Sequence, residues 1–297
     1  MSCYDPHRLP RNRHQVKSKI RFGHTPVSFS GNCHNFTDDY THSGVDFAHS
    51  LVYYSGVSSQ WTVKEIEECE STFNEARKQP AWTIVSARNQ TRGRGRFNRT
   101  WFGSKGGLWA TYNLPLDPAL NRHWGVLPLV AGAALIETLK DFNIQGLRLR
   151  WPNDVLVGRA KLAGILVERP SATMASIGIG LNMFNDINKL EGQTSDPVTR
   201  LCDILPSCPS VEKFRTMLGD VLAELFDYFV ESGLEGILPV LDSAWGEPRP
   251  VVAITDTERY TGYFCSVDYD GSPILRKADG TRFTVPGITV NRMKELI

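Results

Sequence analysis

RNQTRGRGRFNRTW, from Arg88 to Trp101, is the stretch around which the rest of the chain is organised. It holds five arginines and two glycines, and the window from Ala76 to Leu116 contains eight Lys or Arg and no Asp or Glu, although the formal net charge of the chain is only +1. Clustered guanidinium groups can bind carboxylate or phosphate bidentately, and glycine lets backbone N–H groups approach the same anion. The stretch therefore predicts an anion-binding loop.

Two short apolar runs flank this loop, Ala81 to Ala87 (AWTIVSA) and Gly107 to Leu114 (GLWATYNL), and both are typical of buried strands. A loop between such strands lies at the end of a sheet, where α/β folds usually place their sites. The alternatives are a solvated basic loop and an arginine–glycine segment that binds RNA. Because the remaining residues are net acidic, whereas nucleic-acid-binding domains usually present a basic face throughout, RNA binding is disfavoured.

Length and composition are those of an ordinary soluble protein. With 297 residues, 41% of them hydrophobic and 22% charged, the chain can hold one large domain and a small one. It has no apolar run near the roughly 18 residues that span a bilayer and no hydrophobic signal core, so we expect a cytoplasmic protein without a membrane segment. The six cysteines include no C-x-x-C pair and are expected to be free thiols.

The first fifty residues carry six of the seven histidines, but in no metal-ligand spacing. Prolines and the lack of an amphipathic period disfavour an organelle-targeting peptide. We expect residues 1–50 to be a poorly ordered N-terminal extension.

A strand followed by a helix is expected to open the main domain. The strand is predicted at Leu51 to Tyr54, and the helix from about Thr62, where Thr62 and Glu65 have the spacing of a capping box. Helical spacing of apolar residues continues to Ala76. The polar run before Thr62 would then lie at a helix N-terminus, where it either faces a ligand or serves as a cap alone.

The second informative stretch is LRLRWPNDVLVGRAKLAGILVE, from Leu147 to Glu168. Alternation in its first four residues predicts a strand that projects leucines one way and Arg148 and Arg150 the other. Pro-Asn-Asp supplies turn residues, and a further strand follows the next turn. Lys161 in that strand precedes an apolar run, where a lysine is costly to bury unpaired, so we expect it to have an anionic partner.

Periodicity predicts the remaining elements. Helices are expected at Val126–Phe142, Val211–Glu231 and Leu234–Trp245, and a glycine-containing strand at Ser176–Asn182. Residues 249–297 contain short β-rich runs separated by turns, typical of a small β-barrel or sandwich, which leaves 51–248 as the main domain. Because the chain has neither a complete G-x-G-x-x-G fingerprint nor a phosphate loop, any ATP site would lack the common motifs.

Three motifs resemble the signatures of one enzyme family. QTRGRGRFNRTW is similar to the arginine–glycine loop of biotin-protein ligases (the holocarboxylase synthetase family), RWPNDVLVGRAKLAGILVE to their K-W-P-N-D and K-L-A-G-I-L-V-E signature, and SIGIGLNM to their G-x-G-x-N strand. Order and spacing agree from about Leu51 to Asn182. The resemblance implies an α+β fold, with a mixed-sheet, class II synthetase-like catalytic domain of the biotin/lipoate ligase type, helices packed on it, and a small C-terminal SH3-like β-barrel.

The resemblance also implies a reaction. Such enzymes use ATP and Mg2+ to convert biotin to biotinyl-5′-AMP with release of pyrophosphate, and then pass biotin to a lysine of the biotin carboxyl carrier domain of a carboxylase. The first step crowds negative charges together, and closely placed arginines stabilise such a transition state. Members of the family are monomers or homodimers, and either state is open here.

Site residues follow from the same resemblance. Arg96 and Lys161 are implied as the catalytic cations, and Asp154 as a magnesium ligand and a partner of Lys161. The residues implied around biotin are Ser58, Ser59, Gln60, Gln90, Gly93, Arg94, Gly95, Arg96, Lys161 and Gly164. Those implied around ATP are Arg94, Arg96, Arg99, Trp101, Asn153, Asp154 and Asn182.

The sequence departs from the family pattern at several places. Ser58-Ser59-Gln60 stands where Ser-Thr-Asn is common, Arg150 replaces a lysine before W-P-N-D, and Phe97-Asn98 stands where the loop often has glycine. Arginine keeps the charge at position 150 but changes its geometry. Residues 1–50 show no helix-turn-helix pattern, so we expect a ligase without a DNA-binding domain.

Two other functions remain open on the sequence. One is a lipoate or octanoate ligase or transferase of the same fold superfamily, which would also modify carrier lysines. The other is a non-catalytic protein that binds biotin or RNA.

Overall fold

The computed structural model describes residues 60–117, 124–188 and 196–296. All described residues belong to the second of the two units into which the chain divides, residues 56–297. The predictions for residues 1–50, Leu51–Tyr54, Ser58 and Ser59 therefore lie outside the described residues.

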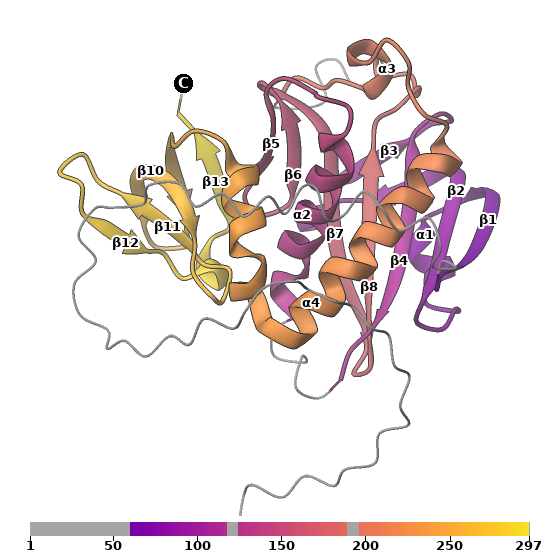
Figure 1. Ribbon diagram of the computed structural model, residues 1–297, viewed down its shortest axis with the longest axis horizontal. Helices are drawn as coiled ribbons and strands as arrows, with labels where there is room; N and C mark the ends of the chain where they lie inside the picture. The colour runs from indigo at the N-terminus through magenta and orange to yellow at the C-terminus, as the bar shows by residue number, and fades with distance from the viewer. Residues whose placement is uncertain (1–59, 118–123, 189–195, 297) are drawn as a thin grey trace, which may run out of the picture. The chain divides into compact units, whose positions relative to one another are not determined.

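A mixed sheet dominates the second unit, with strand order β1-β2-β4-β8-β7-β6-β5 and β3 paired to β2 (Figure 1). Within the described residues, β1 and β2 run parallel and the other neighbours in this sheet are antiparallel. The strands are β1 (Thr62–Cys69), β2 (Thr83–Arg94), β3 (Thr100–Gly103), β4 (Leu108–Pro115), β5 (Leu147–Arg150), β6 (Asp154–Val157), β7 (Ala160–Ser171) and β8 (Met174–Leu181). The predicted mixed sheet is confirmed.

Two helices, α2 (Leu127–Lys140) and α4 (Val211–Trp245), lie side by side across one face of this sheet (Figure 1). Eleven of the fourteen residues of α2 are buried, which explains why its sequence is apolar on nearly every side. Gly233 has φ of 66° and breaks α4 between the two predicted helices. Short helices are α1 (Thr72–Ala76), α3 (Leu201–Ile204), η2 (Arg96–Asn98), η4 (Trp124–Val126) and η6 (Gly287–Thr289). None of the described helices is long and apolar enough to cross a membrane.

The predicted helix from Thr62 is wrong, because Thr62–Cys69 is strand β1. A parallel ladder to β2, from Thr62 opposite Thr83 to Cys69 opposite Gln90, fixes the extended conformation. The segment contains β-branched residues, and its partly buried positions include Lys64 and Ile66, which alternate as in a strand. Only the end of the apolar spacing is helical, in α1, where Phe73 and Ala76 are buried. Tertiary pairing therefore overrode an apparent 3.6-residue period.

The arginine stretch is also more regular than a loop. Strand β2 continues through Arg94 and β3 begins at Thr100, so the irregular part is confined to Gly95–Arg99. Gly93 makes this close pairing feasible, because a Cβ there would lie 2.3 Å from the carbonyl oxygen of Trp101. Phe97 and Asn98, at the position where the family often has glycine, have φ of 56° and 57°. These residues adopt the left-handed backbone conformation that glycine adopts more easily.

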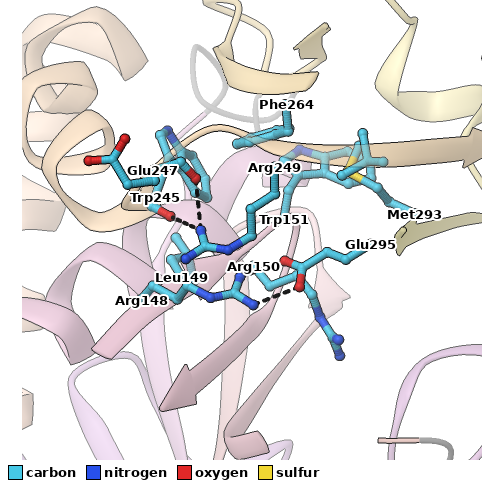
Figure 2. Close-up of a pocket in the computed structure, with 11 residues that line it drawn as sticks. Arg148, Leu149, Arg150, Trp151, Trp245, Glu247, Arg249, Phe264, Met293 and Glu295 are labelled. Atoms are coloured by element: carbon cyan, nitrogen blue, oxygen red, sulfur yellow. Dashed lines mark hydrogen bonds and ion pairs between the residues drawn. The ribbon is translucent and has the colours of Figure 1, made fainter. Parts of the chain in front are cut away.

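The C-terminal residues form a separate antiparallel sheet of five strands in the order β12-β11-β10-β9-β13. Its strands are β9 (Arg249–Ile254), β10 (Arg259–Val267), β11 (Pro273–Arg276), β12 (Arg282–Thr284) and β13 (Arg292–Glu295). This sheet is consistent with the predicted SH3-like domain. Figure 2 shows its junction with the main sheet, where Arg148 of β5 donates to both carboxylate oxygens of Glu295 at 2.5 and 2.6 Å.

Candidate functional site

A cavity of about 980 Å³ lies among the hairpin of strands β2 and β3, strands β7 and β8, and the C-terminal strand β13. It brings together most of the residues that the sequence singled out, although they are separated by up to 92 positions in the chain. Those in its lining are Gln90, Arg94, Gly95, Arg96, Arg99, Trp101, Asn153, Asp154, Lys161, Gly164 and Asn182. Gly93 acts instead in the β2–β3 pairing, and Gln60 is exposed and outside the lining.

The sequence reading missed the pair Ser71–Thr72, of which Thr72 lines the cavity beside Gln90. The backbone N–H and the hydroxyl of Thr72 both donate to the side-chain oxygen of Gln90, at 2.8 and 3.1 Å. Thr111 donates to the hydroxyl of Thr72, and the buried hydroxyl of Ser71 has no hydrogen-bond partner among the described residues. The signal that would have found this pair is Ser-Thr between a strand and a helix, thirteen residues after the predicted polar run at Ser58. The mistaken helix from Thr62 obscured it.

Glycines of β7 and β8 form a trough that Trp101 fills. A Cβ at Gly180 would lie 2.4 Å from Cε2 of Trp101, and one at Gly164 would lie 2.8 Å from its Cζ3. The indole N–H of Trp101 is buried without a hydrogen-bond partner among the described residues. Lys161 Nζ lies 5.3 Å from the centre of the indole, a cation–π distance. Trp101 therefore forms a wall between the sheet and the cationic side of the cavity.

Lys161 has the anionic partner that its burial led us to expect. Its Nζ lies 2.6 Å from Oδ1 of Asp154, and Oδ2 of Asp154 accepts from Arg150 at 2.7 Å. Burial alone would raise the pKa of Asp154, but the charges of Lys161 and Arg150 outweigh it and hold this pKa below its ordinary value of 3.8. The carboxylate is therefore ionised at neutral pH, and each of its two oxygens contacts a cation.

The arginines of the stretch differ in their pairing. Arg94 contacts Glu168 at 3.2 Å and stacks over Phe73 at 5.2 Å, whereas Arg96 donates to the neutral Asn153 Oδ1 at 3.2 Å. Burial lowers the pKa of Arg96, Asp154 partly offsets this effect, and the nearby charge of Arg99 lowers the pKa further. Within residues 60–117, 124–188 and 196–296, no carboxylate lies within 4.0 Å of Arg96 or Arg99. These two guanidinium groups are thus available to an anion.

The donor set does not fit a magnesium ion held by the protein. The described residues contain no group of three or more His, Cys, Asp or Glu that could hold a metal. Both oxygens of Asp154 already contact cations, whereas magnesium requires oxygen ligands at close range. The assignment of Asp154 as a magnesium ligand stays a prediction that this geometry disfavours.

Asn182 has a structural role in addition to its place in the lining. Its side-chain oxygen accepts from Asn185 at 3.1 Å, and its backbone oxygen accepts from Leu201, the first residue of α3. The buried amide thus ties the end of β8 to the following chain.

Comparison with solved structures places this fold in one class. The structure of the Aquifex aeolicus biotin protein ligase, in complex with biotin and ATP, is similar with a TM-score of 0.69 and 22% identity, over 79% of this chain and 99% of that one. That of Leishmania major, in complex with biotinyl-5-AMP, gives a TM-score of 0.51 and 24% identity, over 76% and 98%. The fold is therefore that of biotin protein ligases.

Sequence comparison identifies the family. The model of the biotin/lipoate A/B protein ligase family matches residues 61–182. The biotin–[acetyl-CoA-carboxylase] ligase of Paracoccus denitrificans is 31% identical over 226 residues, which are 71% of this chain and 89% of that protein. The bifunctional ligase/repressor BirA of Bacillus subtilis is 32% identical over 156 residues, 51% of this chain, and the chain spans about half of that protein's length (46%). The chain belongs to the biotin/lipoate A/B protein ligase family.

Proposed function

We propose that this protein is an ATP-dependent biotin–protein ligase that acts on a biotin carboxyl carrier domain in the cytoplasm. The observation that carries the proposal is the pairing pattern of the cavity: among the described residues, Arg96 and Arg99 have no carboxylate partner, and Lys161 lines the same cavity. A site that joins a carboxylate to a phosphate needs such cations. The family and the ligases named among its relatives support the same reaction.

The first step joins two anions. A carboxylate oxygen of biotin attacks the α-phosphorus of ATP, the new C–O–P bond forms as the bond to the β-phosphate oxygen breaks, and pyrophosphate leaves with that electron pair. Arg96 and Lys161 stabilise the charge that develops on the α-phosphate, and Arg99 holds the outer phosphates. A partly desolvated cation contributes more here than in water because the local dielectric constant is lower.

Biotin is assigned to the end of the cavity that contains Thr72 and Gln90. Thr72 and Gln90 offer hydroxyl and amide groups to its polar ring, while the indole of Trp101, which fills the trough at Gly164 and Gly180, contacts its apolar surface. Asn153 and Asn182 lie toward the nucleotide. In the second step, a carrier lysine amine attacks the acyl carbon, the acyl–phosphate bond breaks and AMP leaves. In this scheme, residues 51–248 form the catalytic domain and 249–297 the C-terminal barrel.

Exchange of labelled pyrophosphate into ATP tests the first step. We expect exchange that requires biotin, followed by label transfer from biotin to a carrier domain when one is added. Exchange with lipoate or octanoate in place of biotin would indicate the lipoate-ligase function instead. The absence of exchange with every acid would leave a non-catalytic binding protein and overturn the proposal.

Two substitutions test the assignment of charges. Lys161→Ala is expected to slow exchange about 10²- to 10³-fold, and Arg96→Ala to slow it similarly while raising KM for ATP. Matched controls are Lys105→Ala and Arg88→Ala, which remove exposed cations outside the cavity. Normal turnover of Lys161→Ala, or an equal loss in the controls, would contradict the assignment.

A further inference from the structure

Arg150 and Asp196 carry opposite charges in the lining of the cavity, and the reaction above gives neither a task. We propose that they are positioning residues: they hold Asp154, and through it Lys161, where the proposed adenylation needs the ammonium group. The inference rests on the proposed function for its chemistry and on the contacts below for its geometry.

The contacts form a chain of alternating charge. Nη2 of Arg150 donates to Oδ2 of Asp154 at 2.7 Å and to Oδ2 of Asp196 at 2.8 Å. Oδ1 of Asp154 lies 2.6 Å from Nζ of Lys161. Because Nη2 has two N–H bonds, one for each carboxylate, Arg150 is oriented by both acids at once. Asp154 can then present its other oxygen to Lys161.

The segment from Asp196 to Thr199 also holds the backbone of Lys161. The N–H of Lys161 donates to the carbonyl of Pro197 at 2.7 Å, and the N–H of Thr199 donates to the carbonyl of Lys161 at 3.0 Å. This bridge lies beside a register shift between β6 and β7, where Val155 pairs with Ala163 and Leu156 with Lys161. A single segment thus fixes the lysine at its backbone and, through Asp196 and Arg150, at its side chain.

Asp196 matters because two cations compete for one carboxylate. If its charge were removed, Arg150 could turn both amino groups onto Asp154 in a bidentate pair, which is a stronger contact than a single bond. Lys161 would then lose its contact with Oδ1 of Asp154. A lysine at position 150 has no planar fork with which to bridge the two acids. Arg150, which stands where the family usually has lysine, is therefore accompanied in this chain by a second acidic partner, Asp196.

A spectroscopic test needs neither biotin nor ATP. The ammonium of Lys161 lies 5.3 Å from the ring centre of Trp101, so a fluorine label on that indole senses its position. We would incorporate 5-fluorotryptophan, assign the Trp101 resonance with Trp101→Phe, and record 19F spectra of the variants. Asp196→Asn and Arg150→Lys are expected to move this resonance. The matched control Asp203→Asn removes an exposed carboxylate paired with Arg200 and is expected to leave it in place. An unmoved Trp101 resonance in Asp196→Asn would overturn the proposal.

Kinetics test whether the displaced lysine matters. For Asp196→Asn we expect kcat of biotin-dependent exchange to fall about ten- to a hundredfold, because small misplacements of a reacting group have effects of this size. KM for ATP and biotin should stay within about twofold, and Asp196→Glu should recover most of the rate. In Arg150→Lys, the further effect of Asp196→Asn should be about twofold or less.

The outcomes separate the two proposals. Unchanged kcat in Asp196→Asn, or the same loss in Asp203→Asn, would overturn the positioning role. If the wild-type protein shows no exchange while the Trp101 resonance still moves in Asp196→Asn, the proposed function fails and the charge chain that holds Lys161 is supported.

Discussion

The ion pair between Arg148 and Glu295 offers a quantitative test of how the C-terminal sheet is attached to the main sheet. The two partners differ in exposure: the side chain of Arg148 is 4% exposed and that of Glu295 is 23% exposed. Breaking a buried pair costs about 3–5 kcal/mol when the remaining charge stays buried. The cost should therefore depend on which partner is removed.

The substitution Glu295→Gln leaves the more buried of the two charges, that of Arg148, without its ion-pair partner. Arg148 then has no carboxylate partner among the described residues; its Nε still donates to the carbonyl of Gly158, and it faces the guanidinium of Arg249 across the junction (Figure 2). The pKa of Arg249 is already lowered, first by burial and then by Arg148, and Glu295 offsets part of this effect. We expect a loss of about 3–5 kcal/mol in the free energy of unfolding.

Arg148→Met leaves the more exposed charge and fills the site with an apolar chain of similar length. Because Glu295 can recruit water, the expected loss is smaller, about 1–3 kcal/mol. The double variant Arg148→Met, Glu295→Gln should be more stable than Glu295→Gln alone, because it no longer buries an unpaired cation.

Urea unfolding measures these differences, with tryptophan fluorescence as one probe because Trp245 packs at the same junction, 5.0 Å from Phe264 between ring centres. Far-UV circular dichroism follows the whole fold. A control, Arg259→Met, removes an exposed cation from β10. The reasoning is refuted if Glu295→Gln costs less than Arg148→Met, or if the double variant is the least stable of the three.

Two further outcomes follow from the cavity. Gly180→Ala would place a Cβ 2.4 Å from Trp101 and should lower stability by about 1–3 kcal/mol as the indole is displaced. Gly125→Ala, whose Cβ would meet no atom of the described residues within 4 Å, should not, and thermal unfolding of both variants compares them. Because the folded-state pKa of Asp154 is depressed below 3.8, its contribution to stability is present above that pH and is lost as pH falls through the folded-state pKa. The stability difference between wild type and Asp154→Asn, measured in urea at pH 6 and pH 3, should therefore shrink at the lower pH; a constant difference would contradict it.

Much of the fold was predictable because its strands and helices carry their periodicity locally. The apolar helix α2, the break near Gly233 in α4 and the short strands after Pro250 were all predicted from spacing and turn residues. The prediction was wrong at Thr62–Cys69, where apolar residues three or four positions apart also fit an edge strand. Only pairing with strand β2 decides between a helix and a strand here. The paired residues lie twenty-one positions apart, farther than the span over which sequence periodicity is detected.

Sequence motifs predicted residues that meet in one cavity, but they did not predict how the charges of these residues pair, and the roles of the residues stay predictions. Motifs identified the lining residues from Gln90 to Asn182, and they lie together in one cavity. The same reasoning placed biotin at Ser58, Ser59 and Gln60; Ser58 and Ser59 lie outside the described residues, Gln60 is exposed outside the lining, and the reasoning missed Thr72, which lines the cavity. Asp196 was missed because nothing in its own neighbourhood marks it; its importance comes only from contact with Arg150.

Ion pairs also decide which cations of the acid-free window from Ala76 to Leu116 can bind an added anion. Eight cations within forty-one residues look equivalent along the sequence, but acids from distant strands neutralise some of them: Glu168 meets Arg77 and Arg94, and Glu67 meets Arg88 and Lys105. An arginine that already faces a carboxylate must give up that contact, or share it, before it can bind a phosphate. Arg96, which is partly buried beside a neutral amide, has no such contact within the described part of the chain. We therefore expect an anion that enters the cavity to gain most at Arg96.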